Sequence, residues 1–418
     1  MERRADARTA ALHDARRMTN TTATITARDT PDRAGALDEA TLESFRHRAA
    51  RLDEAGRFPH EDLADLRRIG WLTAAAPKRR GGFGLDLAAL AAEQRRLARY
   101  APATALATSM HHYWVGLAAT LDALGHPFGE RILGWTADGE ILASGHAEIG
   151  NDIPVALSTT RAERVPGGWR LHGRKLFGSL GPVWDRLGLH AMDMSDPSRP
   201  MIVHGFVARG TPGVTVVETW DAHGMRATES HDTVLDGALV ADENVLCVVP
   251  AGPLTDPLLG AMNIWALTLI ANVYVGIAER ALDLALEDAR RRTSIAIPGS
   301  TFAHHPLVQE QVARMHLELD AARVVLDRLA NDWVEGVDHG ARWPVQVLAA
   351  KWRAATAAMT VVDAACEVVG GSSFRRGAEL ERLSRDVRAA RFHPGTDAFT
   401  REIIGKALLE IDASGPRW

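Results

Sequence analysis

The side chains best suited to chemistry lie in three short segments. Two adjacent histidines, His111 and His112, form one segment, and His393 with the nearby Asp397 forms another. An imidazole titrates close to neutral pH, so each of these histidines could transfer a proton or donate a hydrogen bond. The third segment carries a hydroxyl at Ser179. These residue types suit proton transfer and hydrogen bonding to a bound reactant.

The common motifs of hydrolases and metalloenzymes do not fit these segments. Gly178-Ser179-Leu180-Gly181 is not a Gly-x-Ser-x-Gly elbow, because Phe177 stands where the first glycine belongs. His304-His305 and His316 lack a His-Glu-x-x-His arrangement. We therefore expect neither serine-nucleophile hydrolysis nor a bound metal.

The composition is that of an ordinary globular protein. The 418 residues are 46% hydrophobic and 24% charged, and no run approaches the roughly 20 apolar residues needed to span a bilayer. The net charge of −5 comes from 53 acidic and 48 basic residues spread along the chain, which disfavours nucleic-acid binding. Cys247 and Cys366 are too few for a disulfide framework or a zinc site. We expect a soluble, cytoplasmic protein that binds no membrane.

The pattern of apolar residues divides the chain into four regions. It predicts an α+β fold that is mostly helical. Residues 1–36 read as a mobile N-terminal arm, and residues 37–138 as a helical domain interrupted by Pro59, Pro77 and Pro102. Residues 139–250 form a central β domain. Residues 251–412 form a four-helix bundle, with helices about Ile270–Leu284, Leu307–Leu329, Val345–Val369 and Thr400–Leu409.

The central domain contains short β-rich runs separated by turns. Ser158–Val165, the turn Pro166-Gly167-Gly168 and Trp169–Gly173 predict a hairpin. The series continues with Ile202–Val207, Val214–Val217 and Thr233–Val240. Because no helix-length pattern interrupts these strands, we expect an antiparallel barrel or sandwich.

Several motifs resemble those of acyl-CoA dehydrogenases, and they follow the order of that family. Trp220–Ser230, with its Gly-Met-Arg-x-Thr stretch, resembles the family's middle domain, and Pro77–Gly84 resembles a turn of its N-terminal domain. Four segments resemble its C-terminal bundle: Val275–Leu282, Val369-Gly370-Gly371, Arg385-Asp386 and Gly395-Thr396. Each motif alone is weak, but the ordered series covers about Leu37 to Leu409.

The resemblance implies a flavin, usually FAD with FMN as the alternative, between the β domain and the bundle of a homotetramer. Phe177, Gly178 and Ser179 match the strand that presents an aromatic ring and a hydroxyl donor to the flavin. In the bundle, the matching residues are Arg291 or Arg292 for the pyrophosphate, the turn Gly370-Gly371, the pair Gly395-Thr396, and Glu367 in place of the family's amide side chain.

The carboxylate base of ordinary acyl-CoA dehydrogenases is missing. Its usual position is Pro394, and the alternative position on the first bundle helix is Leu267. His393 or Asp397 could replace it as the base. In the reduced-flavin monooxygenases of this fold, a histidine of the last region and a Phe-x-Ser stretch border the oxygen adduct, and His393 with Phe177-Gly178-Ser179 resembles both. His111-His112 resembles the histidine-bearing helix of that branch.

The site residues and the family resemblance together predict three alternative functions. The leading one is a monooxygenase that takes reduced flavin from a separate reductase and oxygenates a small organic substrate, with Ser179, His393 and His111 or His112 in the active site. The second is α,β-dehydrogenation of an acyl thioester, with Asp397 or His393 as the base. The third is a flavin-free scaffold that has lost its chemistry.

Overall fold

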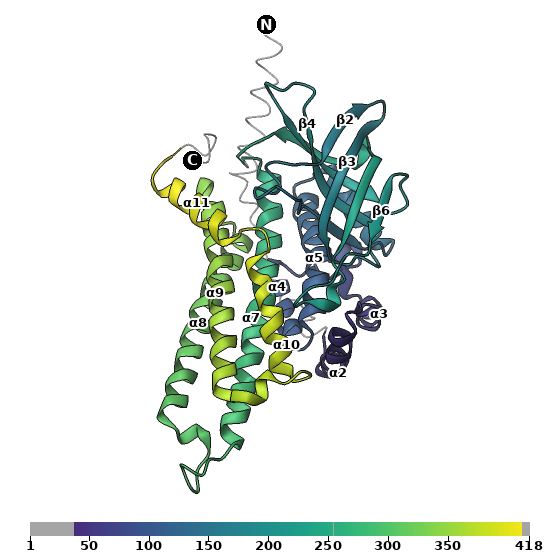
Figure 1. Ribbon diagram of the computed structural model, residues 1–418. Coiled ribbons are helices and arrows are strands. Elements are labelled where there is room, and N and C mark those ends of the chain that lie inside the picture. Colours follow the sequence, from purple (N-terminus) through teal and green to yellow (C-terminus); the bar gives the residue numbers. More distant parts are fainter. Residues whose placement is uncertain (1–36, 254, 412–418) are drawn as a thin grey trace.

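The computed structural model describes residues 37–253 and 255–411, so the predicted N-terminal arm lies outside the described residues. Helices come first, a sheet follows, and a helical bundle ends the chain, as the sequence predicted (Figure 1). The first part contains α2 (Glu39–Ala55), α3 (His60–Arg68), α4 (Leu87–Ala98), α5 (Pro102–Ala123) and α6 (Pro127–Ala137). Asp38 caps α2 by accepting a bond from the Thr41 amide, and Gly56 ends it in a left-handed conformation.

The sheet is mixed and open, which corrects the expectation of an antiparallel barrel or sandwich. Its strands are β1 (Leu142–Gly145), β2 (Arg161–Val165), β3 (Gly168–Gly178), β4 (Arg186–Asp193), β5 (Met201–Ala208), β6 (Val214–Val217), β7 (His231–Ala241) and β8 (Val245–Pro250). The order is β6-β7-β3-β2-β4-β5-β8, with β1 beside β4. β4 pairs in parallel with both β1 and β2, whereas the remaining pairs are antiparallel, including the predicted β2–β3 hairpin.

The bundle consists of three long helices and a divided fourth segment. The long helices are α7 (Pro257–Arg291), α8 (Pro306–Val334) and α9 (Trp343–Val369). The predicted last helix is α11 (Asp397–Leu408), and a short α10 (Glu379–Asp386) precedes it. His393 lies in the segment between α10 and α11, after the short helix Val387–Arg391 and before α11, so it is outside the helices of the bundle.

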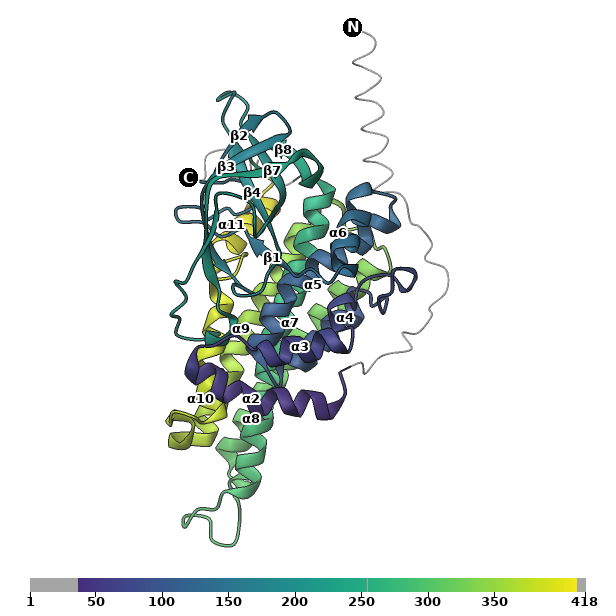
Figure 2. The ribbon, with the colours of Figure 1, turned by 90° about the vertical axis from the view of Figure 1, so that its right-hand side faces the viewer.

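Of the N-terminal helices, α4 and α5 pack on α7, the most buried helix of the bundle (Figure 2). Gly116 of α5 lies against the Trp265 ring so closely that a Cβ atom would be 2.3 Å from it. On another face of α5, the Trp114 ring lies against Gly188 of β4. This packing fixes α5 between the sheet and the bundle.

Two helical stretches, Pro257–Arg291 and Gly340–Phe374, are long and apolar enough by composition to cross a membrane. Their most apolar windows are 83% and 50% buried inside the protein. Burial against neighbouring helices accounts for their apolar character, as in the core helices of a bundle.

Candidate functional site

Phe177, Gly178 and Ser179 lie together where β3 ends. The register of β3 against β7 shifts just before Gly178, which lies opposite His231. The Phe177 side chain is 56% exposed, and its ring meets the Trp220 ring edge to face with 6.0 Å between centroids. The strand therefore ends in an aromatic side chain that a planar ligand can reach.

Backbone strain is concentrated around this strand end. Phe177, Leu180, Met225 and Glu229 all have positive φ angles, between 38° and 68°. They belong to the strand end or to the loop 225–230 that packs on it. Such conformations cost about 1–3 kcal/mol each in non-glycine residues and cluster at functional sites. The strain therefore marks this region as a candidate site.

A row of hydroxyl groups joins Ser179 to the loop 225–230. Ser179 Oγ lies 2.8 Å from Ser230 Oγ, which lies 2.7 Å from Thr228 Oγ1. Thr228 donates to the Met225 carbonyl at 2.9 Å. Each hydroxyl has one proton, and that of Thr228 is donated to Met225. Ser230 therefore donates to Thr228, and Ser179 donates to Ser230. This arrangement leaves the Ser179 oxygen as an acceptor; the resemblance implied a hydroxyl donor to a flavin.

Asp386 fixes the same loop on α10. The Met225 amide donates to Asp386 Oδ1 at 2.5 Å, and the carboxyl group is almost fully buried. The preceding residue, Gly224, packs so closely on the Arg385 carbonyl that a Cβ atom would lie 2.2 Å from it. The loop thereby connects the end of β3 with the C-terminal helices.

His393 is paired with Tyr274, a fully buried residue of α7. His393 Nε2 lies 2.6 Å from the Tyr274 hydroxyl oxygen. Because the hydroxyl has no other acceptor among the described residues, we assign it as the donor to Nε2, which places the proton of the neutral imidazole on Nδ1. Burial lowers the pKa of His393 to about 3, with a further lowering from Lys351. Burial raises the pKa of Tyr274 well above its ordinary value.

Lys351 holds the segment that carries His393. Its buried ammonium donates to the carbonyls of Ala390 at 2.9 Å and Gly395 at 3.0 Å, and lies 3.4 Å from that of His393. Gly395 has a φ of 76°, and a Cβ atom there would lie 2.9 Å from the Leu348 side chain. A glycine is therefore required at this turn.

Thr396 and Asp397 begin α11. Thr396 is its N-cap and accepts from the Phe399 amide at 3.4 Å, whereas Asp397 forms a partly exposed ion pair with Arg401 at 3.4 Å. Both side chains therefore have roles in starting the helix.

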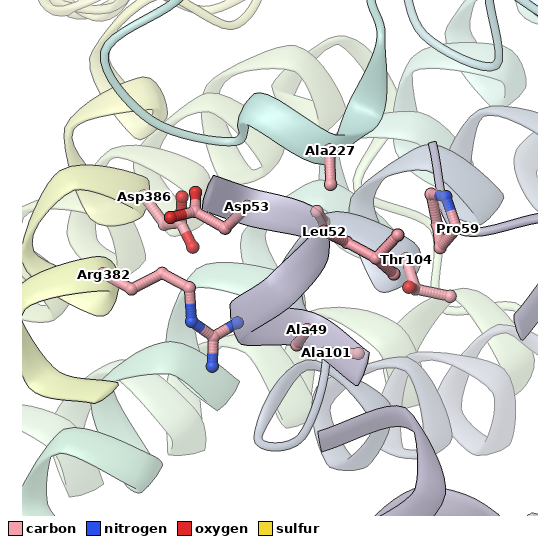
Figure 3. Close-up of a pocket in the computed structure, with 10 residues that line it drawn as sticks. Ala49, Leu52, Asp53, Pro59, Ala101, Thr104, Ala227, Arg382 and Asp386 are labelled. Atoms are coloured by element: carbon pink, nitrogen blue, oxygen red, sulfur yellow. The ribbon is translucent and has the colours of Figure 1, made fainter. Parts of the chain in front are cut away.

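A small pocket opens beside Asp386 (Figure 3). Its polar wall carries Asp53, Arg382 and Asp386, and its other wall includes Leu52 and Thr104. Burial raises the pKa of the Asp386 carboxyl to about 6, against the lowering effect of Arg382. The pocket gives this buried, titratable group a neighbouring space for water.

The predicted phosphate-binding arginine Arg292 is engaged within the chain. Its guanidinium donates to the carbonyls of Val368 and Val369 at the end of α9 and lies 3.0 Å from Asp288. The guanidinium also lies 3.3 Å from a Cβ position at Gly370, so the structure brings these two predicted residues together.

The other residues predicted at this end are exposed. Arg291 is 3.8 Å from Asp288 and its side chain is 85% exposed. Glu367 accepts from Gln311 on α8 at 2.9 Å. Gly371 has open space where a Cβ atom would lie. No contact within the described chain connects this group with the end of β3.

His111 is committed to backbone contacts. Its Nε2 lies 2.8 Å from the Leu72 carbonyl, and its Nδ1 accepts from the Leu142 amide at 3.1 Å. Neither nitrogen is left for a reactant, so we assign His111 to the fold. His112 is also fully buried, against the Trp71 ring, and neither of its nitrogens has a partner among the described residues.

The strand end suits the ring of a flavin, since it combines an accessible aromatic side chain with a hydroxyl acceptor. The acidic side chain that sequence reasoning missed in this loop is Glu229. Its carboxylate lies 3.7 Å from Arg57 and 3.7 Å from His231 Nε2. The two positions of the family's base hold Pro394 and the buried Leu267.

Three stacked histidines lie inside the β domain. His190 lies between His146 and His204, with centroid distances of 5.3 and 5.8 Å. The buried ion pair of Lys175 and Glu148, 2.6 Å apart, is next to them. Across residues 37–253 and 255–411 no group of histidine, cysteine or acidic side chains is placed to hold a metal ion.

The sequence predicted Ser179 and His393 as site residues but did not point to the residues that support them. Tyr274 lies within the predicted helix Ile270–Leu284, and Asp386 was part of a motif only. A signal for Tyr274 did exist, because a buried tyrosine hydroxyl generally requires a partner.

Comparison with known proteins connects the chain with flavoenzymes. Models of the N-terminal and C-terminal domains of acyl-CoA dehydrogenases match residues 36–127 and 265–409. The chain is 32% identical to the putative acyl-CoA dehydrogenase YdbM of Bacillus subtilis, over 85% of this chain and 91% of that protein. It is 30% identical to L-evernosamine nitrososynthase of a Micromonospora species, over 86% and 84%.

A similar solved structure is that of KijD3 in complex with FMN and a dTDP-linked amino sugar. It superposes with a TM-score of 0.80 at 28% identity, covering 94% of this chain and 97% of that chain.

Proposed function

Since the chain belongs to the acyl-CoA dehydrogenase family of flavoprotein oxidoreductases, we propose that it is a reduced-flavin monooxygenase acting on a small organic substrate. A bound reduced flavin would supply two electrons and activate oxygen. We further propose a separate flavin reductase as the electron source, a homotetrameric assembly and a cytoplasmic location.

The observation that carries the proposal is the Tyr274–His393 hydrogen bond. A base whose conjugate acid has a pKa of about 3 is poorly matched to removing a substrate proton near neutral pH. The same imidazole, with its proton on Nδ1, is a hydrogen-bond donor throughout the neutral range. His393 therefore suits the stabilisation of a developing negative charge on oxygen.

Ser179 supports the reduced form of the cofactor. Because its proton is directed to Ser230, its oxygen can accept from an N–H group of a ligand. A reduced flavin carries one more ring N–H than an oxidised flavin, and this difference favours the reduced form at the strand end. Phe177 would cover the edge of the ring and exclude water.

The alternative is dehydrogenation of an acyl thioester, and the similarity to YdbM supports it. It needs a carboxylate base. Asp397 is a weak candidate, because it lies at a helix start and pairs with Arg401.

One pair of experiments decides between these functions. The protein with oxidised flavin is mixed anaerobically with a panel of acyl-CoA thioesters, and the visible absorbance is followed. In parallel, reduced flavin is supplied by an unrelated reductase, and substrate-dependent oxygen incorporation is measured with labelled oxygen by mass spectrometry. We expect no bleaching by any thioester, together with label in the product of an accepted substrate. Bleaching would favour the dehydrogenase, and failure to bind FMN and FAD would favour the flavin-free scaffold.

A further inference from the structure

We propose that Asp386 is a pH-dependent positioning residue that holds the loop 225–230, and through it the Ser179 hydroxyl row, in the arrangement that binds the ligand. This inference rests on the proposed function only for the identity of the reaction. The arrangement itself concerns flavin binding and can be tested without turnover.

The hydroxyl row is held by a hydrogen bond between Asp386 and a strained loop. Met225 has a φ of 53°, and its amide donates to Asp386 Oδ1 at 2.5 Å. The Met225 carbonyl accepts the last bond of the hydroxyl row, from Thr228. A shift of Met225 therefore moves Thr228, Ser230 and Ser179 together. Hydrogen bonds to a charged carboxylate are about twice as strong as those to a neutral acceptor, so ionised Asp386 holds this loop best.

The charged surroundings place the titration of Asp386 near neutral pH. On α10 it has Arg382 and Arg385, on α2 Asp53, and on α7 Tyr274. Burial and Asp53 raise the pKa of Asp386, the two arginines and the Met225 amide lower it, and the balance is about 6.

The pocket shown in Figure 3 gives protons a way to reach this group. Asp53, Arg382 and Asp386 line it together. Arg382 Nε is buried and has no hydrogen-bond partner among the described residues, so a water molecule in the pocket would satisfy it. Such a water would also lie beside Asp386.

The test is the affinity of the protein for reduced and oxidised FMN, measured by flavin fluorescence between pH 5.5 and 8. For the natural protein we expect affinity to be constant above pH 7 and to fall about fivefold, with a midpoint near pH 6, as Asp386 gains a proton. Asp386→Asn keeps an oxygen acceptor for the Met225 amide but has no charge. We expect it to show the weaker affinity at every pH.

The matched control is Asp320→Asn, which removes a surface carboxylate of α8 that pairs with Arg323. It should retain the natural pH profile. Thermal melting of each variant reports whether it is folded. The natural protein alone also tests the idea, so a variant that fails to fold does not end the experiment.

The inference is overturned if the natural protein binds FMN equally at pH 5.5 and 8, if it binds no flavin, or if folded Asp386→Asn keeps the midpoint near pH 6. A flat profile in a protein that incorporates labelled oxygen would reject this inference and leave the proposed function standing. If the affinity for FMN changes with a midpoint near pH 6 in a protein that oxidises acyl-CoA, this inference stands and the proposed function is rejected.

Discussion

The imidazole of His393 and the phenol of Tyr274 form one hydrogen-bonded unit whose two members are 119 residues apart in the sequence. Tyr274 is fixed in the middle of the buried helix α7, whereas His393 lies in the loop between α10 and α11. The rings are 5.6 Å apart at an angle of 50°, so their contact is through the hydrogen bond and not through stacking. A rigid helix thus sets the direction in which a loop histidine presents its N–H group.

The first prediction concerns Tyr274→Phe. Without the phenol, the proton of His393 is free to move to Nε2, and the donor on Nδ1 is no longer specified. We expect the yield of oxygenated product per reduced flavin to fall about tenfold or more, at the low end of the effect of a positioned acid or base. Oxygen uptake should continue, because oxidation of the flavin does not need this donor.

The control for that variant is Tyr113→Phe, which removes another buried phenol, bonded to Ser144 at 2.6 Å. Product yield and oxygen uptake are measured together with product analysis and an oxygen electrode. Equal losses of yield in the two variants would contradict a specific role for Tyr274.

The second prediction is that Lys351→Met destabilises the protein. The substitution leaves the Ala390 carbonyl without its lysine donor and the Gly395 carbonyl with only the Thr400 hydroxyl, in a buried site. Burial lowers the pKa of Lys351 to about 8, so the ammonium is mainly charged at pH 7. We expect the free energy of unfolding to fall by about 2–4 kcal/mol, as measured by denaturant titration.

Lys406→Met serves as the matched control for that substitution. Lys406 pairs with Glu402 one turn away on α11, and loss of such a pair should cost about 0.5 kcal/mol or less. A loss at Lys351 no larger than this would show that the carbonyls find other partners.

The third prediction concerns the choice of flavin. Because Arg292 donates to the carbonyls of Val368 and Val369, FAD gains little from it unless that contact opens. We expect FMN to bind at least as tightly as FAD in calorimetric titrations. Arg292→Ala should lower the affinity for both flavins to the same extent or not at all. A selective loss of FAD binding of tenfold or more would instead indicate that Arg292 holds the pyrophosphate.

The sequence allowed the order of helices, sheet and bundle to be predicted, because that order depends on local periodicity and on motifs. It did not reveal the mixed sheet. β4 contains Leu187, Leu189 and Ala191 together with buried residues between them, so the alternation that marks a one-sided strand is absent. Its parallel pairing with β1 joins segments about 40 residues apart, a relationship that local periodicity does not encode.

The site was predicted in part for the same reason. Ser179 and His393 were predicted as site residues because each occurs in a recognisable motif. Tyr274, Lys351 and Asp386 act through contacts between distant helices and loops, and their neighbours in the sequence do not indicate those contacts.

The last prediction is a steep loss of stability in mild acid. Burial lowers the pKa of six histidines, which therefore remain neutral in the folded protein: His111, His112, His146, His190, His204 and His393. In the unfolded chain each gains a proton below about pH 6.5. Their contribution to stability is complete above that pH and decreases as the pH falls toward the folded-state pKa values, about 3 for His204.

Four carboxyl groups act in the opposite direction. Burial raises the pKa of Asp62 and Asp386 to about 6, and it also raises the pKa of Glu93 and Glu279, so in mild acid the folded protein binds protons more readily at these groups than the unfolded chain does. Six histidines outnumber these four carboxyl groups, and stability should fall between pH 6.5 and 5.

The variant His204→Leu removes one of the six histidines. It should reduce the slope of the unfolding free energy against pH by about 1.4 kcal/mol per pH unit. Phe206→Leu, which changes a buried side chain of the same strand that does not titrate, should leave the slope unchanged. The measurement is urea unfolding at half-unit steps of pH, and equal slopes for the natural protein and His204→Leu would contradict the assignment.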